Sequence, residues 1–168
     1  MTSVSQPFDE PTYPLASCRL RPLLAADARS LAPLICELDP WRTLGVSAEL
    51  MGRTLTRQDP ILRRFVVLHG EQTAGVICLR HPWLRGAYLE LFCIFPAFQK
   101  RKLGREVMQW FAQRTYAVAD NVWATVSSFN EPARAFYRAI GFQELCVLTD
   151  LVKPGFDEIL LRRARGGP

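Results

Sequence analysis

The sequence lacks long apolar runs, paired cysteine motifs and low-complexity segments. No stretch of its 168 residues reaches the roughly 18 to 20 apolar residues that a membrane helix needs. The first 17 residues contain Asp9, Glu10 and three prolines. They have neither a basic start nor an apolar run, so a secretion signal is not predicted. We expect a cytoplasmic protein with no membrane partner.

Cysteine usage also excludes two classes of small scaffold. The five cysteines are widely spaced, their number is odd, and no C-x-x-C pair occurs. This pattern argues against a disulfide framework and against a zinc site. We therefore expect buried, reduced thiols and no bound metal.

Composition is that of an ordinary globular domain. Apolar residues make up 49% of the chain and charged residues 22%, which is typical of a folded protein with one sizeable core. No internal repeat or linker divides the chain. The prediction is a flexible tail over residues 1–17, one domain over 18–163, and a basic tail over 164–168.

The basic charge balance indicates an anionic partner. The formal net charge is +5 and the sequence pI is about 9.2, so both a nucleic acid and a phosphorylated cofactor are candidates. No DNA- or RNA-binding motif is present, and the charge gathers in one loop and at the C-terminal end. Nucleic acid is therefore not the expected partner.

Apolar periodicity predicts an α/β chain. Strands are expected over residues 18–24, 65–68, 74–80, 86–95, 121–127, 142–148 and 158–161. Helices are expected over residues 25–38, after the cap Ser47, from Gly104 onward, and over 130–140.

A basic loop joins the most apolar strand to an amphipathic helix. Its sequence is Phe-Gln-Lys-Arg-Lys-Leu-Gly-Arg over residues 98–105. A helix N-terminus presents unpaired N–H groups and the positive end of the helix dipole, which together bind phosphate. Gly104 permits close backbone approach. A solvated basic turn is the alternative interpretation of this loop.

A second motif follows the strand at 121–127. It reads Asn-Glu-Pro-Ala-Arg-Ala-Phe-Tyr-Arg-Ala-Ile-Gly-Phe over residues 130–142. Asn130 is a good N-cap, Pro132 falls in the first turn, and Gly141 can take a left-handed conformation after the helix. A well-capped amphipathic helix explains these positions without any function.

Together the two motifs resemble the GNAT acetyltransferase superfamily. Gln99 and Gly104 match the ends of its Q/R-x-x-G-x-G/A pyrophosphate loop, whereas Lys102 replaces the first glycine. The second motif is similar to N-x-x-A-x-x-[FY]-Y-x-x-x-G-F. The resemblance implies a mixed sheet of about seven strands with about four helices, whose fourth and fifth strands splay apart to hold acetyl-CoA. The acetyl-CoA contacts it implies are Cys93, Ile94, Phe95, Gln99, Lys100, Arg101, Lys102, Leu103, Gly104, Arg105, Asn130, Phe136 and Tyr137.

The resemblance also suggests catalytic roles. Tyr137 matches the family tyrosine near the CoA sulfur and is the expected general acid, with packing as its alternative role. Glu90 is the expected general base, because burial in an apolar strand would raise its pKa. Its alternative is an outward-facing surface position. Some relatives keep a glutamate on the fifth strand, where this sequence reads Ala124-Thr125-Val126 and offers no such carboxylate.

The acceptor is less constrained. Trp41 and Arg42 lie between the first two expected helices and are candidates for the acceptor lip, or for a hydrophobic cap. The resemblance is nearest the ribosomal-protein alanine N-acetyltransferases, which implies a protein N-terminus as acceptor. A small-molecule amine remains open. Two further alternatives also remain open: an acetyl-CoA sensor without turnover, and a homodimer formed through the final strand.

Overall fold

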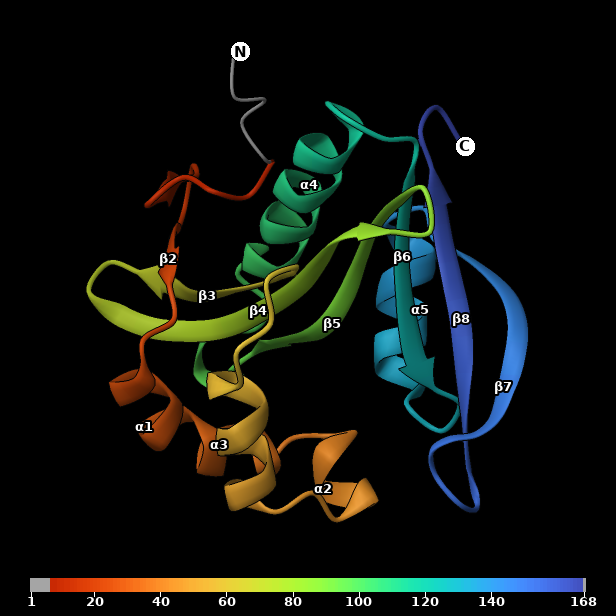
Figure 1. Cartoon of the computed structure of the whole chain (residues 1–168), viewed down its shortest axis with the longest axis horizontal. Helices are drawn as coiled ribbons and strands as arrows, with labels where there is room; N and C mark the ends of the chain where they lie inside the picture. Colours follow the sequence, from red (N-terminus) through yellow and green to blue (C-terminus); the bar gives the residue numbers. More distant parts are fainter. Residues whose placement is uncertain (1–6, 168) are drawn as a thin grey trace. The chain divides into compact units, whose positions relative to one another are not determined.

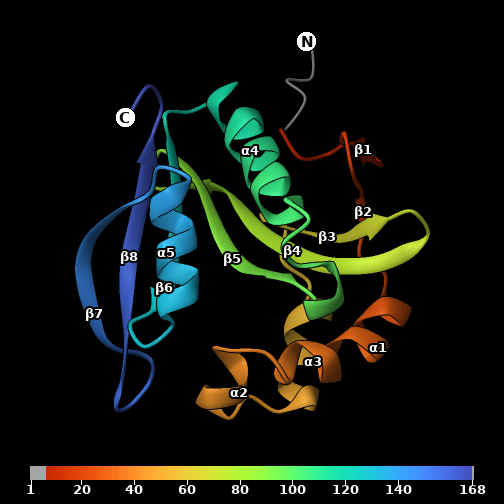
Figure 2. The ribbon, with the colours of Figure 1, turned by 180° about the vertical axis from the view of Figure 1, so that it is seen from behind.

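The structure, a computed structural model, describes residues 7–167 (Figures 1 and 2). The described chain is an α/β protein with eight strands and five α-helices. This confirms the predicted class. The strands are β1 (Tyr13–Pro14), β2 (Arg19–Pro22), β3 (Leu62–His69), β4 (Gln72–Trp83), β5 (Gly86–Ile94), β6 (Asn121–Ser127), β7 (Gln143–Lys153) and β8 (Phe156–Ala164). The helices are α1 (Ala25–Cys36), α2 (Trp41–Leu44), α3 (Ala48–Thr56), α4 (Leu103–Tyr116) and α5 (Glu131–Ala139), with a 3-10 turn, η1, at Pro96–Phe98.

These elements form two compact units, each built from two chain segments. The first unit contains residues 7–22 and Ile61–Val122, and the second contains Leu23–Pro60 and residues 123–167. No helix within residues 7–167 is both long and apolar enough to cross a membrane.

The first unit is an antiparallel meander with α4 packed on it. Each of β1 to β4 pairs with the next strand along the chain. An aromatic cluster joins α4 to the sheet, since the Trp110 ring lies 5.7 Å from Phe65 and 4.8 Å from Tyr13 between centroids. Phe8 packs on the same indole at 5.7 Å. Large buried aromatic rings of this kind supply much of a small core's stability.

The N-terminal segment differs from the flexible tail predicted over residues 1–17. Residues 7–17 belong to the folded unit rather than to a tail, because Phe8 and Tyr13 are buried. Asp9 also pairs with Arg63 at 2.7 Å. Short segments rich in proline lack a hydrophobic period, so this packing could not be predicted from the sequence. The rest of the predicted tail, residues 1–6, lies outside the described part.

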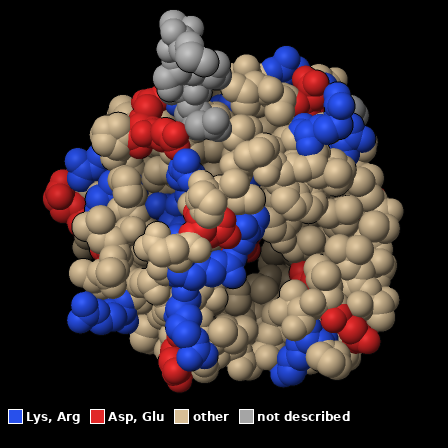
Figure 3. Space-filling model, in the orientation of Figure 1, with Lys and Arg blue, Asp and Glu red and all other residues tan. Residues whose placement is uncertain are grey.

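The second unit combines α1 to α3, α5 and the antiparallel pair β7–β8. Helices α1 and α3 pack closely, since a Cβ atom built on Gly52 would lie 3.9 Å from the Cβ of Ala32. Ser47 caps α3 by accepting a hydrogen bond from the Leu50 amide at 3.1 Å, as predicted. Strand β7 is an exposed edge, and the surface over β7 and β8 is largely uncharged (Figure 3).

The cysteine prediction is confirmed in part. All five cysteines are free thiols. Cys18, Cys78 and Cys93 are buried as expected, whereas Cys36 is half-buried and Cys146 is exposed. Cys146 lies on β7, whose residues are exposed almost throughout.

Candidate active site

The basic loop lies between β5 and α4 in the first unit. Strand β5 ends where the Phe95 amide donates to the carbonyl of Ala74 at 2.8 Å, and η1 follows. The Gln99 side chain then donates from Nε2 to the carbonyl oxygen of Ile94 at 2.9 Å. This hydrogen bond folds the loop back onto the end of the strand. Gln99, the first residue of the motif, therefore has a structural role in shaping the loop.

Two lysines give the loop its backbone shape. Lys100 has φ 61° and Lys102 has φ 64°, both in the left-handed region that favours glycine. Lys102 is the N-cap of α4 (ψ 2°), and no side chain caps the first amides of this helix. The turn that a glycine makes in the family motif is therefore made here by a lysine. That geometry leaves the helix N-terminus open to an anion.

The charges of the loop surround this helix end. Lys100, Arg101, Lys102 and Arg105 are all exposed, while Leu103 is buried and anchors the helix. Arg101 lies over the ring of Phe98, 5.7 Å from its centroid, and this contact restricts the guanidinium. The loop thus combines free amides, the helix dipole and four cations, the combination that a pyrophosphate requires.

The second motif forms α5 in the second unit, as predicted. The Asn130 side chain accepts from the Ala133 amide at 3.3 Å. Gly141 has φ 90°, in the left-handed region, and the Phe142 amide closes the helix by donating to the carbonyl of Tyr137 at 3.0 Å. Tyr137 is buried, with the rings of Phe136 and Phe142 at 5.5 and 5.4 Å. Its ring is therefore held in one orientation.

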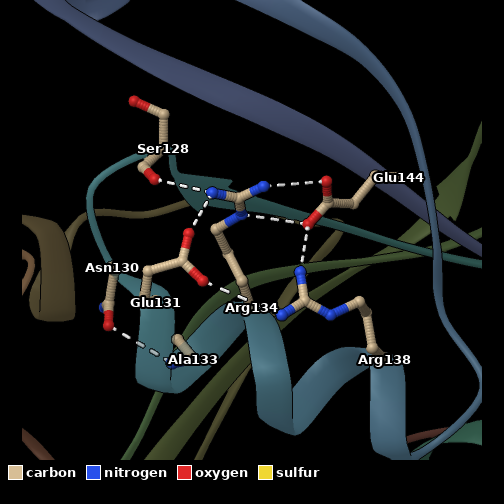
Figure 4. A network of polar contacts seen from close by, with 7 residues as sticks. All are labelled: Ser128, Asn130, Glu131, Ala133, Arg134, Arg138 and Glu144. Atoms are coloured by element: carbon tan, nitrogen blue, oxygen red, sulfur yellow. Dashed lines mark hydrogen bonds and ion pairs between the residues drawn. The ribbon is translucent and has the colours of Figure 1, made fainter.

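Arg134 fastens this helix to its surroundings (Figure 4). Its guanidinium donates to both carboxylate oxygens of Glu144 on β7, each at 3.0 Å, and to the carbonyl of Ser128 at 3.1 Å. The Arg134 hydrogen bond, assisted by Arg138, lowers the pKa of Glu144. Bidentate pairs of this type fix geometry as well as adding energy. The network positions the helix that carries Tyr137. The part played by Glu144 was not predicted from the sequence.

The family is decided by a match over residues 29–142 to the model of the acetyltransferase (GNAT) family. The chain belongs to the GNAT family. The matched segment contains both motifs and covers more than half of the chain. No curated protein sequence matches it.

Solved structures share the fold at low sequence identity. An acetyltransferase from Thermus thermophilus is 24% identical, with a TM-score of 0.70 over 89% of this chain and 98% of that chain. A chimeric spermidine N-acetyltransferase derived from Vibrio cholerae is 20% identical, with a TM-score of 0.73 over 90% and 97%. The ribosomal-protein-S18-alanine N-acetyltransferase from Escherichia coli is 18% identical, with a TM-score of 0.66 over 88% and 93%.

Glu90, the base expected in this GNAT chain, is paired with a cation. Its Oε2 accepts a hydrogen bond from Nε of Arg80 on the neighbouring strand β4, and both side chains are mostly buried. The ion pair gives Glu90 a contact that stabilises the β4–β5 pair. Its role as a base stays a prediction.

The end of β5 keeps the backbone close to its neighbour. A Cβ atom built on Gly75 would lie 2.2 Å from the carbonyl oxygen of Cys93, so only glycine fits. Burial raises the pKa of the Cys93 thiol to about 12, and this excludes a thiolate nucleophile at neutral pH. Ile94 and Phe95 complete the segment.

The expected acceptor residues form a short helix that the sequence analysis did not predict. Trp41 and Arg42 begin α2, and Arg42 pairs with Asp39 at 2.8 Å. Thr43 donates to the same carboxylate at 2.7 Å, and this hydrogen bond, followed by the charge of Arg42, lowers the pKa of Asp39. Lys153 joins the helix end by donating to the carbonyl of Leu44 at 2.9 Å. The end of α2 is thus fastened to the β7–β8 turn.

One buried carboxyl was missed by sequence reasoning. Glu158 on β8 is 5% exposed and accepts a hydrogen bond from the hydroxyl of Ser127, itself 1% exposed. Burial raises the pKa of Glu158, and the Ser127 hydrogen bond partly offsets this. A glutamate within the apolar run at residues 156–161 was the only available signal.

The predicted site residues therefore fall into two sets. The loop, the end of β5 and Glu90 belong to the first unit, while Trp41, Arg42, Asn130, Phe136 and Tyr137 belong to the second. Within residues 7–167, no group of three His, Cys, Asp or Glu side chains could hold a metal ion.

Proposed function

We propose that this GNAT chain transfers the acetyl group of acetyl-CoA to a primary amine by direct attack in a ternary complex. One observation carries the proposal: an uncapped helix N-terminus follows a loop of four exposed cations, with Lys102 in the left-handed turn where the family has glycine. Free amides, dipole and cations match the pyrophosphate of acetyl-CoA. Membership of the family supports the same donor.

The chemistry needs two proton transfers. The unprotonated amine attacks the thioester carbonyl, a C–N bond forms, and the C–S bond breaks. Tyr137 is the proposed acid that gives its phenolic proton to the leaving sulfur, since its ring is buried and held between two other rings. A main-chain N–H group near the end of β5 is the proposed donor to the oxyanion.

The acceptor is proposed to be a protein N-terminus or a small-molecule amine, with α2 as part of its lip. The neighbours support amine acceptors in general, because one acts on spermidine and another on a ribosomal protein. Arg42→Ala should raise the acceptor KM and leave acetyl-CoA affinity unchanged. Arg53→Ala is a matched control, since it removes an exposed arginine of α3 that is likewise paired with an acid, Glu49.

The test begins with thermal-shift titration of acetyl-CoA against free CoA. A ligand at one hundred times its Kd stabilises a protein by about 2.7 kcal/mol, or about 5–11 °C in Tm for a chain of this size. Product mass is then measured over a panel of N-terminal peptides, polyamines and aminoglycosides. No stabilisation at millimolar acetyl-CoA would overturn the proposal.

The second candidate is an acetyl-CoA sensor without turnover. It is favoured by the ion pair of Glu90 with Arg80, which engages the expected base. Stabilisation by acetyl-CoA with no acetylated product from any acceptor class, including peptides from the host proteome, would favour the sensor. Product formation from one acceptor class would exclude it.

A further inference from the structure

A buried carboxylate that pairs with no cation is costly to a folded protein, and Glu158 is such a group. Removing an ionised carboxyl from water is repaid only by hydrogen bonds or a partner charge. Two other partly buried carboxylates have arginine partners: Glu90 has Arg80, and Glu144 has Arg134. Within residues 7–167, no Lys or Arg pairs with Glu158, and its one hydrogen bond comes from the neutral hydroxyl of Ser127 at 2.5 Å.

One carboxylate oxygen of Glu158 stays available. The hydroxyl of Ser127 engages Oε1, while Oε2 accepts no hydrogen bond from any residue between 7 and 167. Among the described residues, the fully buried side-chain atoms without a hydrogen-bond partner do not include Oε2 of Glu158. This oxygen therefore keeps some contact with solvent. A carboxylate with one oxygen fixed and the other open has the arrangement of a proton acceptor.

The carboxylate lies at the turn that leads into α5. Ser127 ends β6, and the next residue donates from its amide to the carbonyl of Asp157 at 2.9 Å, so Ser127 and Glu158 are opposite each other on β6 and β8. The carbonyl of Ser127 in turn accepts from the amide of Asn130 at 2.9 Å. Asn130 caps the helix that carries Tyr137.

Ser127 shares a face of β6 with Thr125, because side chains two residues apart point the same way in a strand. Glu158 supplies a carboxylate to that face from the neighbouring strand.

We propose that Glu158 is the general base of the acetyl transfer, accepting the proton that the acceptor amine loses, directly or through one water. This inference rests on the proposed function. The amine nitrogen forms the C–N bond and passes its proton to Oε2, while the C–S bond breaks and Tyr137 protonates the sulfur. Glu158 then releases its proton to solvent and Tyr137 regains one, so the amide and CoA thiol are the net products.

The surroundings of Glu158 suit this role. Burial raises its pKa toward the working range of a base, and the Ser127 hydrogen bond keeps it from rising further. Charged groups on the neighbouring elements have other partners. Arg162 lies over Trp123 at 5.7 Å, Arg134 faces Glu144, and the Asp157 carboxylate accepts from the Asp150 amide at 3.4 Å.

The experiment compares Glu158→Gln with Glu90→Gln in the full chain, using an acceptor identified in the panel above. Glutamine keeps the shape of glutamate and an oxygen for Ser127. We expect Glu158→Gln to lower kcat/KM by about 10²–10⁴-fold and to remove the acidic limb of its pH profile. Glu90→Gln should keep that limb. Glu71→Gln, at a carboxylate that is 92% exposed, is the control for loss of one negative charge.

Ser127→Ala provides a second, independent readout. It removes the hydrogen bond that lowers the pKa of Glu158, so the acidic limb of kcat/KM should move to higher pH while acetyl-CoA affinity stays unchanged. A merely structural role would lower activity at all pH values without moving the limb. This variant decides the matter if Glu158→Gln does not fold.

Two results would overturn the inference. One is a Glu158→Gln enzyme with wild-type kcat/KM and an intact acidic limb, and the other is a Ser127→Ala limb at the wild-type position. Failure of the proposed function looks different, because wild-type protein would then show neither stabilisation by acetyl-CoA nor product.

Discussion

The left-handed backbone conformation of Lys102 can be tested by comparing the stabilities of the glycine and alanine variants at this position. Its backbone has φ 64° and ψ 2°, a left-handed conformation at the N-cap of α4. Such a conformation costs a residue with a Cβ about 1–2 kcal/mol, while glycine loses about 0.5–1 kcal/mol through its freer unfolded chain. Lys102→Gly should therefore be more stable than Lys102→Ala by about 0.5–1 kcal/mol, or about 1–4 °C in Tm.

The comparison is controlled within the same helix. Both variants remove the same charge, so the difference between them reports on the backbone alone. Gln109 is exposed in the interior of α4, where alanine should exceed glycine by about 1 kcal/mol. The sign of the alanine–glycine difference should therefore reverse between positions 102 and 109.

The assay is thermal and urea unfolding of the four variants at one pH without ligand. If Lys102→Gly is less stable than Lys102→Ala, as expected at position 109, then position 102 is not left-handed and the reasoning about the loop fails. Acetyl-CoA affinity adds a functional readout. A tighter complex with the glycine variant would mean that the turn, as well as the charge, matters for binding.

Three further predictions follow from burial. Gly75→Ala should cost at least about 1–3 kcal/mol through overpacking, because its Cβ would lie 2.2 Å from a backbone oxygen. Gly52→Ala in α3, whose Cβ would make an ordinary van der Waals contact with Ala32 at 3.9 Å, should instead stabilise by up to about 1 kcal/mol; urea unfolding measures both. In native protein, a disulfide reagent should label exposed Cys146 quickly and leave Cys93 unmodified, since burial raises the pKa of Cys93 to about 12; mass mapping of labelled peptides would contradict this if Cys93 reacts first. The raised pKa of Glu158 means that the folded state holds a proton that the unfolded state has lost, so stability falls as pH rises from the unfolded pKa through the folded one; Glu158→Gln should flatten that part of the Tm–pH curve, and an unchanged curve would contradict the assignment.

Local signals in the sequence predicted the long elements and both motifs. Asn130 and Gly141 delimit α5 as expected, because a cap and a left-handed turn depend on residues close along the chain. The short elements β1 and α2 were not predicted. Two or four residues are too few to show a period, and tertiary contacts stabilise them.

The sequence by itself determined the α/β class, the family and the position of the basic loop before α4, since these depend on periodicity and on spacing within short segments. Only the tertiary structure decided the partners of the charged groups. Arg80 meets Glu90 across a strand pair interrupted by bulges, and Ser127 meets Glu158 from 31 residues away. Which carboxylate is paired with a cation and which stays available therefore depends on strand register and burial. Neither exists before the strands have paired.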